Sequence, residues 1–159
     1  MDFVQGGRRI FESRAGLSYL GVPLGRQVYL GLADGNLEEQ ATVLTESVQD
    51  AVDWIKPDRV ITTGLDGYDG HPDHIATHMA AVSVADAMSI VGYDVMILAL
   101  SAGHTGEVHL LGDIDRKLGA MGLHASQVVV PDLLQWGGTD LYTPLVTEGE
   151  AYTTSMAAW

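Results

Sequence analysis

Three histidines and three aspartates occupy one short stretch of the chain, and their types and spacing could support chemistry. They are Asp66, Asp69, His71, Asp73, His74 and His78. Imidazole and carboxylate groups are the ligands that zinc accepts when cysteine is absent, and this chain contains no cysteine. A carboxylate beside a histidine can also fix the tautomer of the ring. The stretch therefore predicts a metal or acid–base site. The alternative is that Asp73 and Pro72 cap a helix and the histidines are exposed.

His74 and His78 are four residues apart, so they would share one face of a helix, as the ligands of helical metal sites do. Pairs with this spacing also arise often by chance. For His78 we favour the interpretation of a surface or half-buried residue.

The elements around this stretch are typical of an α/β domain. An apolar run at 59–63 predicts a buried strand, a glycine-rich loop follows at 64–70, and a helix is expected from Pro72 to about Val91. A second apolar strand is expected at 95–100. Other expected elements are helices at 8–20, 38–55 and 114–122 and strands at 27–32 and 128–130. This alternation predicts a mostly parallel sheet, in which ligands bind beyond the carboxyl ends of the strands, where residues 64–74 would lie.

The composition limits the classes of partner. The 159 residues suffice for one domain with a substantial core. The chain has 8 basic and 21 acidic residues, and its formal charge of -13 disfavours binding to nucleic acid and to anionic lipid. The most apolar region, from Met79 to Leu100, is interrupted by Asp86 and Gly92 and therefore does not predict a membrane span. With no signal peptide visible, we expect a cytoplasmic protein.

The segment Gly70-His71-Pro72-Asp73-His74, between an apolar strand and an alanine-rich helix, resembles the second signature of the PIG-L/LmbE-like zinc-dependent N-acetylglucosaminyl deacetylases. Further segments resemble the family in the family's order, so that the resemblance spans roughly residues 8–153. They are the arginine pair at 8–9 with Leu-Gly-Val at 20–22, Y-L-G-L-A-D-G at 29–35, W-I-K-P-D-R-V-I at 54–61, K-L-G-A-M and H-A-S-Q within 117–127, and E-A-Y at 150–152.

The resemblance implies a Rossmann-like three-layer α/β sandwich with a single zinc ion. It implies hydrolysis of the acetamide of an N-acetylglucosamine unit in a small amino-sugar conjugate, or of a related amide. His74 resembles the zinc-ligand histidine, and His71 the histidine that stabilises the tetrahedral intermediate or protonates the leaving amine. Asp73 resembles the carboxylate that orients His71. A cationic imidazole at His71 would meet developing oxyanion charge, and a zinc-bound water is partly hydroxide at neutral pH.

One family feature is missing from the sequence. The family opens with a strand ending in an A-H-P-D-D-E motif, which supplies two further zinc ligands and the general base, and the seven residues before Arg8 do not contain it. We therefore expect one deacetylase-like domain over residues 1–159 that is incomplete at its N-terminus. Truncation is the favoured interpretation. A non-catalytic sugar-binding or interaction module with a relict site, and a site completed by a second chain, are the alternatives, and a homo-oligomer is left open.

Several further residues are candidates for substrate binding. Asp66, Tyr68 and Asp69 lie beside the signature and could contact a sugar hydroxyl, although we slightly favour a solvated turn. His124 belongs to a family-like stretch, and its alternative is a polar helix end. A second polar cluster of His104, Glu107 and His109 could line the cleft, but we favour ordinary loop residues there.

Overall fold

The computed structural model describes residues 3–93, 95–100, 108–110, 113–126 and 150–155. The chain divides into two compact units. The first, here called the helical unit, comprises residues 1–29 and 111–149, and the second, the sheet unit, comprises residues 30–110 and 150–159. The organisation of residues 1–159 as a single domain stays a prediction.

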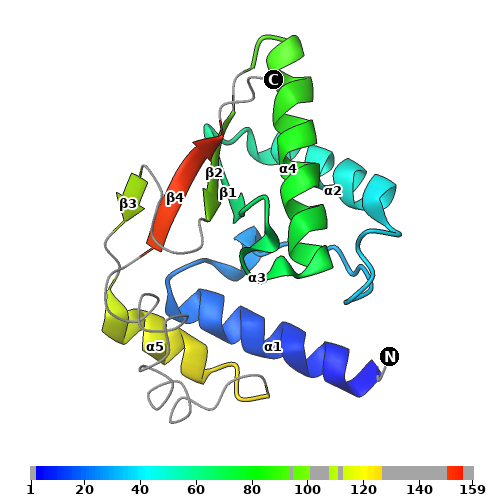
Figure 1. Cartoon of the computed structure of the whole chain (residues 1–159). Helices are drawn as coiled ribbons and strands as arrows, with labels where there is room; N and C mark the ends of the chain where they lie inside the picture. Colours follow the sequence, from blue (N-terminus) through cyan, green and yellow to red (C-terminus); the bar gives the residue numbers. More distant parts are fainter. Residues whose placement is uncertain (1–2, 94, 101–107, 111–112, 127–149, 156–159) are drawn as a thin grey trace. The chain divides into compact units, whose positions relative to one another are not determined.

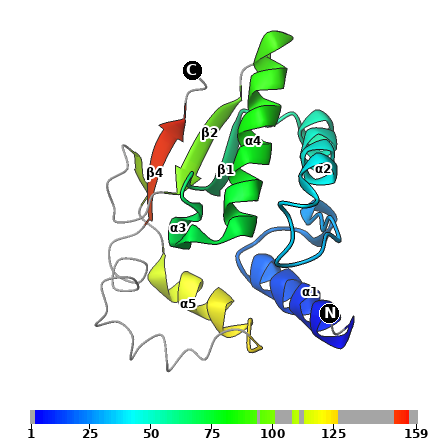
Figure 2. The same cartoon turned by 45° about the vertical axis from the view of Figure 1, so that its right-hand side comes forward.

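A four-stranded sheet forms the centre of the sheet unit, with the strand order β1-β2-β4-β3 (Figures 1 and 2). Its strands are β1 (Arg59–Thr63), β2 (Met96–Leu100), β3 (Val108–Leu110) and β4 (Glu150–Ser155). β1 and β2 are parallel, with Arg59 opposite Met96 and Thr63 opposite Leu100. β4 runs antiparallel to both β2 and β3. In the described residues β1 is therefore an edge strand, hydrogen-bonded to β2 alone.

The observed strands confirm part of the sequence interpretation. The predicted strands at 59–63 and 95–100 are present as β1 and β2 and pair in parallel. The expectation that residues 59–63 are buried is wrong, because every residue of β1 is exposed or half-buried. The expectation of a mostly parallel sheet does not fit the described strands, because β4 joins by two antiparallel pairings and makes the sheet mixed. Residues 27–32 belong to no strand in the described part of the chain, where they have no neighbouring strand to supply a hydrogen-bonded ladder. Residues 128–130 lie outside the described residues, and the Rossmann-like sandwich stays a prediction.

Helix α4 (Pro72–Ile90) packs on β1 and β2 and connects them. It begins at a proline, whose missing N–H is not needed in the first turn, and it ends before Gly92, which has a φ of +81°. Small residues face the sheet, so that Ala81 and Ala85 lie against Ile97 of β2, with Val60 of β1 beside them. This packing holds the start of α4 at the carboxyl end of β1.

Helix α2 (Ala41–Ile55) packs on α4, and its end is fixed before the chain enters β1. Val52 of α2 contacts Val84 and Met88 of α4 in a second buried cluster. The helix stops at Lys56, which adopts a left-handed conformation with φ of 51° and donates its backbone N–H to the Val52 carbonyl over 2.7 Å. Pro57 then prevents continuation of the helix.

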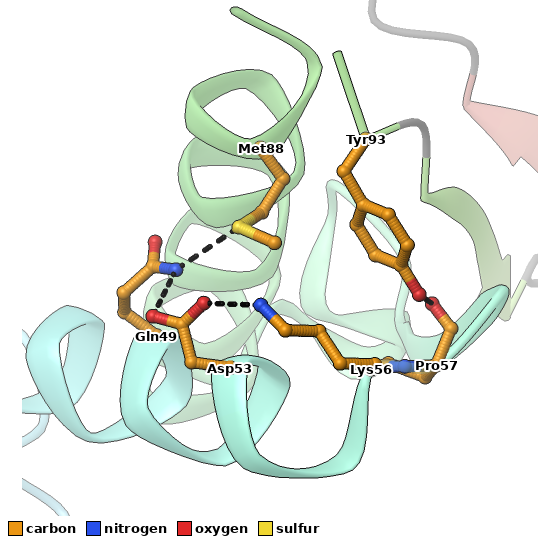
Figure 3. Close-up of polar contacts among 6 residues, drawn as sticks. All are labelled: Gln49, Asp53, Lys56, Pro57, Met88 and Tyr93. Carbon is orange, nitrogen blue, oxygen red and sulfur yellow. Dashed lines mark hydrogen bonds and ion pairs between the residues drawn. The ribbon is translucent and has the colours of Figure 1, made fainter. Parts of the chain in front are cut away.

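Polar contacts hold the ends of α2 and α4 together (Figure 3). Gln49 donates to the Met88 sulfur over 3.2 Å and to Asp53 over 3.0 Å. The Tyr93 hydroxyl donates to the Pro57 carbonyl over 3.2 Å. Because Pro57 precedes β1 and Tyr93 precedes β2, this bond ties together the chain segments that lead into the two parallel strands.

The helical unit contains α1 (Phe3–Tyr19), a short 3-10 helix (Leu24–Arg26) and α5 (Ile114–Gly122). The helices predicted at 8–20 and 114–122 are thus confirmed, although α1 begins earlier than expected. α1 and α5 pack at glycines, since a Cβ at Gly16 would lie 2.9 Å from His124 Nε2. Glu12 of α1 accepts hydrogen bonds from the backbone N–H and the hydroxyl of Ser126.

The apolar run from Met79 to Leu100 is divided between α4, a turn at Gly92 and β2, as the sequence predicted. Within the described part of the chain, no helix is long and apolar enough to cross a bilayer.

Candidate functional site

The candidate site lies where β1 passes into α4. After Thr63 the chain makes a turn at Gly64, then the single helical turn α3 (Gly67–Gly70), and α4 begins at Pro72. Gly67 and Gly70 have φ values of +69° and +79°, in the left-handed region that glycine adopts without strain. His71 is the N-cap residue of α4, and His74 lies in the first turn of that helix. Both histidines therefore lie beyond the carboxyl end of β1, as the sequence predicted.

The ring of His74 is oriented by a backbone carbonyl. Its Nδ1 lies 3.0 Å from the Gly67 oxygen, and because a carbonyl can only accept, Nδ1 must carry the proton. In the neutral ring the lone pair is then on Nε2. A histidine whose Nδ1–H is bound to a carbonyl is the usual arrangement behind a metal-ligating Nε2.

His71 has the opposite arrangement. Its Nδ1 accepts a hydrogen bond from the backbone N–H of Asp73 over 3.2 Å, so the proton of the ring is on Nε2. The cationic form of His71 that the resemblance implies stays a prediction. A neutral His71 still donates from Nε2. The two ring centroids are 4.9 Å apart and the ring planes are tilted by 38°, so the donor and the lone pair belong to neighbouring rings.

Asp73 connects the histidines to a loop far away in the sequence. Its carboxylate accepts from the backbone N–H groups of Gly35 (2.5 Å) and Leu37 (2.9 Å), and only 7% of the residue is exposed. Burial alone would raise the pKa of Asp73, but the hydrogen bonds from Leu37 and Gly35 and the attraction of His71 and His74 together hold that pKa below its ordinary value. The carboxylate thus anchors the turn at residues 34–37, while the Asp73 backbone N–H is the group that orients Nδ1 of His71.

A cavity of about 350 Å³ lies between the segment 30–37, α2 and the start of α4. Its walls are largely apolar, and the polar residues among those that line it are Asp34, Asp73 and Thr77. The remaining lining residues are Leu30, Gly31, Leu32, Ala33, Leu37, Leu44 and Val48. Cavities of this size with a few polar groups are typical of small-molecule sites. The attachment of the turn at residues 34–37 to Asp73 could not be predicted from the sequence.

The other candidate substrate-binding residues come from several different segments of the chain. Asp66 is exposed, and its carbonyl accepts from the Gly70 N–H over 3.0 Å. Tyr68 and Asp69 lie in α3, and their side chains are outside the described part of the structure, as is the side chain of His109 in β3. His124 belongs to the helical unit, where it packs on Gly16. His104 and Glu107 lie outside the described residues.

His78 differs from its sequence interpretation as a surface or half-buried residue. It is buried, with 5% exposure, and its Nδ1 lies 2.7 Å from the Thr63 carbonyl oxygen at the end of β1. The helical spacing from His74 indicated a shared face, but the packing of α4 on β1 decides that this face is buried.

Zinc sites usually have at least three protein ligands. Among the residues that the structure describes, no three His, Cys, Asp or Glu side chains gather closely enough to hold a metal ion. His74 has the orientation of one zinc ligand, but these residues do not form a complete zinc site.

Comparison with known proteins gives matches that include this region. A family model described as PIG-L, GlcNAc-PI de-N-acetylase, matches residues 4–85. A 1D-myo-inositol 2-acetamido-2-deoxy-alpha-D-glucopyranoside deacetylase of Mycolicibacterium gilvum (strain PYR-GCK) is 35% identical over 102 residues, covering 52% of this chain and 34% of the relative. A protein of the same name from Corynebacterium diphtheriae (strain ATCC 700971 / NCTC 13129 / Biotype gravis) is 36% identical over 101 residues, covering 54% of this chain and 33% of the relative.

The match to these relatives covers about a third of their length. No solved structure gives a significant match to the chain. The matched family region contains both candidate histidines and Asp73.

Proposed function

The chain belongs to the PIG-L family, and on this basis we propose that the protein is a zinc-dependent hydrolase that removes the N-acetyl group from an N-acetylglucosamine-containing small molecule. The observation that carries the proposal is the pairing of His71 and His74, whose neighbouring rings carry an N–H and a lone pair on Nε2 within the matched region. A Rossmann-like fold and a cytoplasmic location, both expected from the sequence, are part of the same proposal.

Hydrolysis of an acetamide requires water to add to the acetyl carbon and the C–N bond then to break, giving acetate and a free amine. Negative charge develops on the acetyl oxygen, and the leaving nitrogen must gain a proton. His71 can stabilise the negative charge on the acetyl oxygen, since its Nε2–H is a hydrogen-bond donor at the N-terminus of α4. A bound zinc would supply Lewis acidity and would lower the pKa of a bound water, and His74 is the described residue that would serve as one of its ligands.

The substrate class follows from the relatives and the cavity. The printed names of the two relatives describe an acetamido sugar joined to inositol. In this chain, the cavity beside Asp73 combines apolar walls with the carboxylates of Asp34 and Asp73. Carboxylates accept hydrogen bonds from sugar and polyol hydroxyls, so we propose an uncharged amino-sugar conjugate as the substrate.

A second candidate, a non-catalytic sugar-binding module with a relict site, is favoured by one observation. The described residues do not bring three metal ligands together. This candidate predicts saturable sugar binding without hydrolysis and without a zinc requirement.

Acetate release decides between the two candidates. The protein is incubated with zinc and with the acetamido-glucosyl inositol named above or with free N-acetylglucosamine, and acetate is followed by proton NMR. We expect release by the wild type and its loss in His71→Ala and His74→Ala, while Asp50→Asn, a change at an exposed position of α2, retains activity. Saturable sugar binding with no acetate in any variant would establish the module instead.

A further inference from the structure

We infer that His78 is a positioning residue that fixes the end of β1 against α4 and thereby sets the orientation of His74. His78 is 5% exposed and lies one helical turn after His74. Its Nδ1 is 2.7 Å from the carbonyl oxygen of Thr63, the last residue of β1. Because the carbonyl can only accept, the His78 Nδ1–H is the donor of this bond.

Thr63 is held to α4 by a second bond. Its hydroxyl donates to the carbonyl of His74 over 2.6 Å, so both the backbone and the side chain of Thr63 are tied to the first turns of the helix. A carbonyl of the first helical turn still has a lone pair for such a donor. The two hydrogen bonds fix the end of β1 to α4 at two points, His74 and His78.

The connection from Thr63 to the His74 ring is short. The Gly67 N–H donates to the Gly64 carbonyl over 2.9 Å, which closes a tight turn directly after the strand. Gly67 lies so close to α4 that a Cβ there would approach Ile75 Cγ1 to 2.9 Å. The carbonyl of this same Gly67 binds His74 Nδ1. A strand end displaced from α4 would therefore move the carbonyl that selects the His74 tautomer.

The residue at position 78 must carry a hydrogen-bond donor to bind the Thr63 carbonyl. A buried polar group is costly unless it is hydrogen-bonded, and an apolar residue at this position of α4 would serve packing alone. The His78 Nδ1–H supplies a donor to Thr63 that leucine could not supply. The importance for catalysis of the hydrogen bonds between Thr63 and α4 rests on the proposed function, but their effect on the orientation of His74 does not.

Three variants at position 78 separate positioning from packing. Asparagine places an amide N–H near the position of Nδ1, glutamine places it near Nε2, and leucine removes the donor. The readout is the pair of ¹⁵N shifts of the His74 ring in the metal-free protein, assigned by their loss in His74→Ala. We expect His78→Asn to keep a protonated Nδ1 on His74 as in the wild type, and His78→Gln and His78→Leu to shift both nitrogens toward an averaged tautomer.

The inference is overturned if folded His78→Leu or His78→Gln keeps the wild-type His74 shifts, or if folded His78→Asn loses them. Should His78→Leu fail to fold, the comparison of the asparagine and glutamine variants decides. The readout requires neither zinc nor turnover, so a protein without deacetylase activity could still pass this test, and an active one could fail it.

Discussion

Asp73 shows how one residue can serve two parts of a site. Its backbone N–H orients His71, and its carboxylate holds the turn at 34–37. The sequence could indicate His71, Asp73 and His74 as candidate site residues, because their types and spacing are local features. It could not predict the tautomer of His74 or the anchored turn, since these depend on a carbonyl at Gly67 and on N–H groups 36 and 38 residues from Asp73.

The lowered pKa of Asp73 predicts a specific loss of stability in acid. The folded protein binds a proton at Asp73 more weakly than the unfolded chain does, whose pKa is near 3.8. The stabilisation is fully present above that value and is lost as the pH falls through the folded pKa. We expect Asp73→Asn to cost about 1–3 kcal/mol at neutral pH and to show a smaller fall in unfolding free energy below pH 4 than the wild type. Urea melts at several pH values measure this, with Asp50→Asn as the control, and parallel curves for wild type and Asp73→Asn would contradict it.

At the scale of elements, the junction of β1, α3 and α4 positions the histidines. The sequence predicted the bounds of β1 and the start of α4 correctly, because a run of β-branched residues and a proline in the first helical turn are strong local signals. The end of α4 differs from the prediction by one residue. The strand expected at 27–32 is not one in the described structure, since strand formation depends on a partner and not on the residues alone. His78 was expected to be on the surface or half-buried and is buried, because the spacing of residues does not reveal which face of a helix is packed.

Gly67 and Gly70 give a matched test of this junction. Both have positive φ, so alanine at either position is strained by about 1–2 kcal/mol. Only Gly67 also faces a neighbour, Ile75 Cγ1 at 2.9 Å from an added Cβ, whereas a Cβ at Gly70 meets nothing within 4 Å. We expect Gly67→Ala to lower the unfolding free energy by a further 1–3 kcal/mol or so relative to Gly70→Ala. Equal losses in thermal or urea melts would show that the turn does not lie tightly on α4.

The core under the site can be tested with two isoleucines on neighbouring strands. Ile97 of β2 is 2% exposed and packs on Ala81 and Ala85, whereas Ile61 of β1 is 60% exposed. Truncation of Ile97 to alanine should therefore cost about 2–5 kcal/mol, as for other buried aliphatic residues. Ile61→Ala should cost much less. A similar loss for both variants would mean that the observed faces of the sheet are misassigned.

At the scale of the whole molecule, the relevant features are the net charge and the division of the chain into units. The chain carries a formal charge of -13 and divides into two compact units. Composition predicted the charge and its consequences for partners directly. The mixed sheet could not be predicted from local pattern, because β4 comes from the far end of the chain and its direction is set by long-range pairing.

The excess of acidic residues predicts a stabilising effect of salt. Like charges repel in the compact state, and salt at about 0.15 M screens charges beyond about 8 Å. We expect the melting temperature to rise between low salt and this ionic strength. Scanning calorimetry in sodium chloride measures the effect, with an uncharged osmolyte as the control for non-ionic effects. A melting temperature that falls with salt would mean that attractive ion pairs outweigh the repulsion.

Calorimetric titration of the purified protein with zinc tests whether His74 is a zinc ligand, as proposed above. We expect the wild type to bind one zinc ion per chain, which requires ligands in addition to His74. Loss of a group that only orients a metal ligand already costs about 10- to 100-fold in affinity, so His74→Ala should weaken zinc binding by more than about 100-fold. Asp50→Asn should bind zinc like the wild type. Zinc affinity that is unchanged in His74→Ala, or no zinc binding by the wild type, would rule out the proposed role of His74.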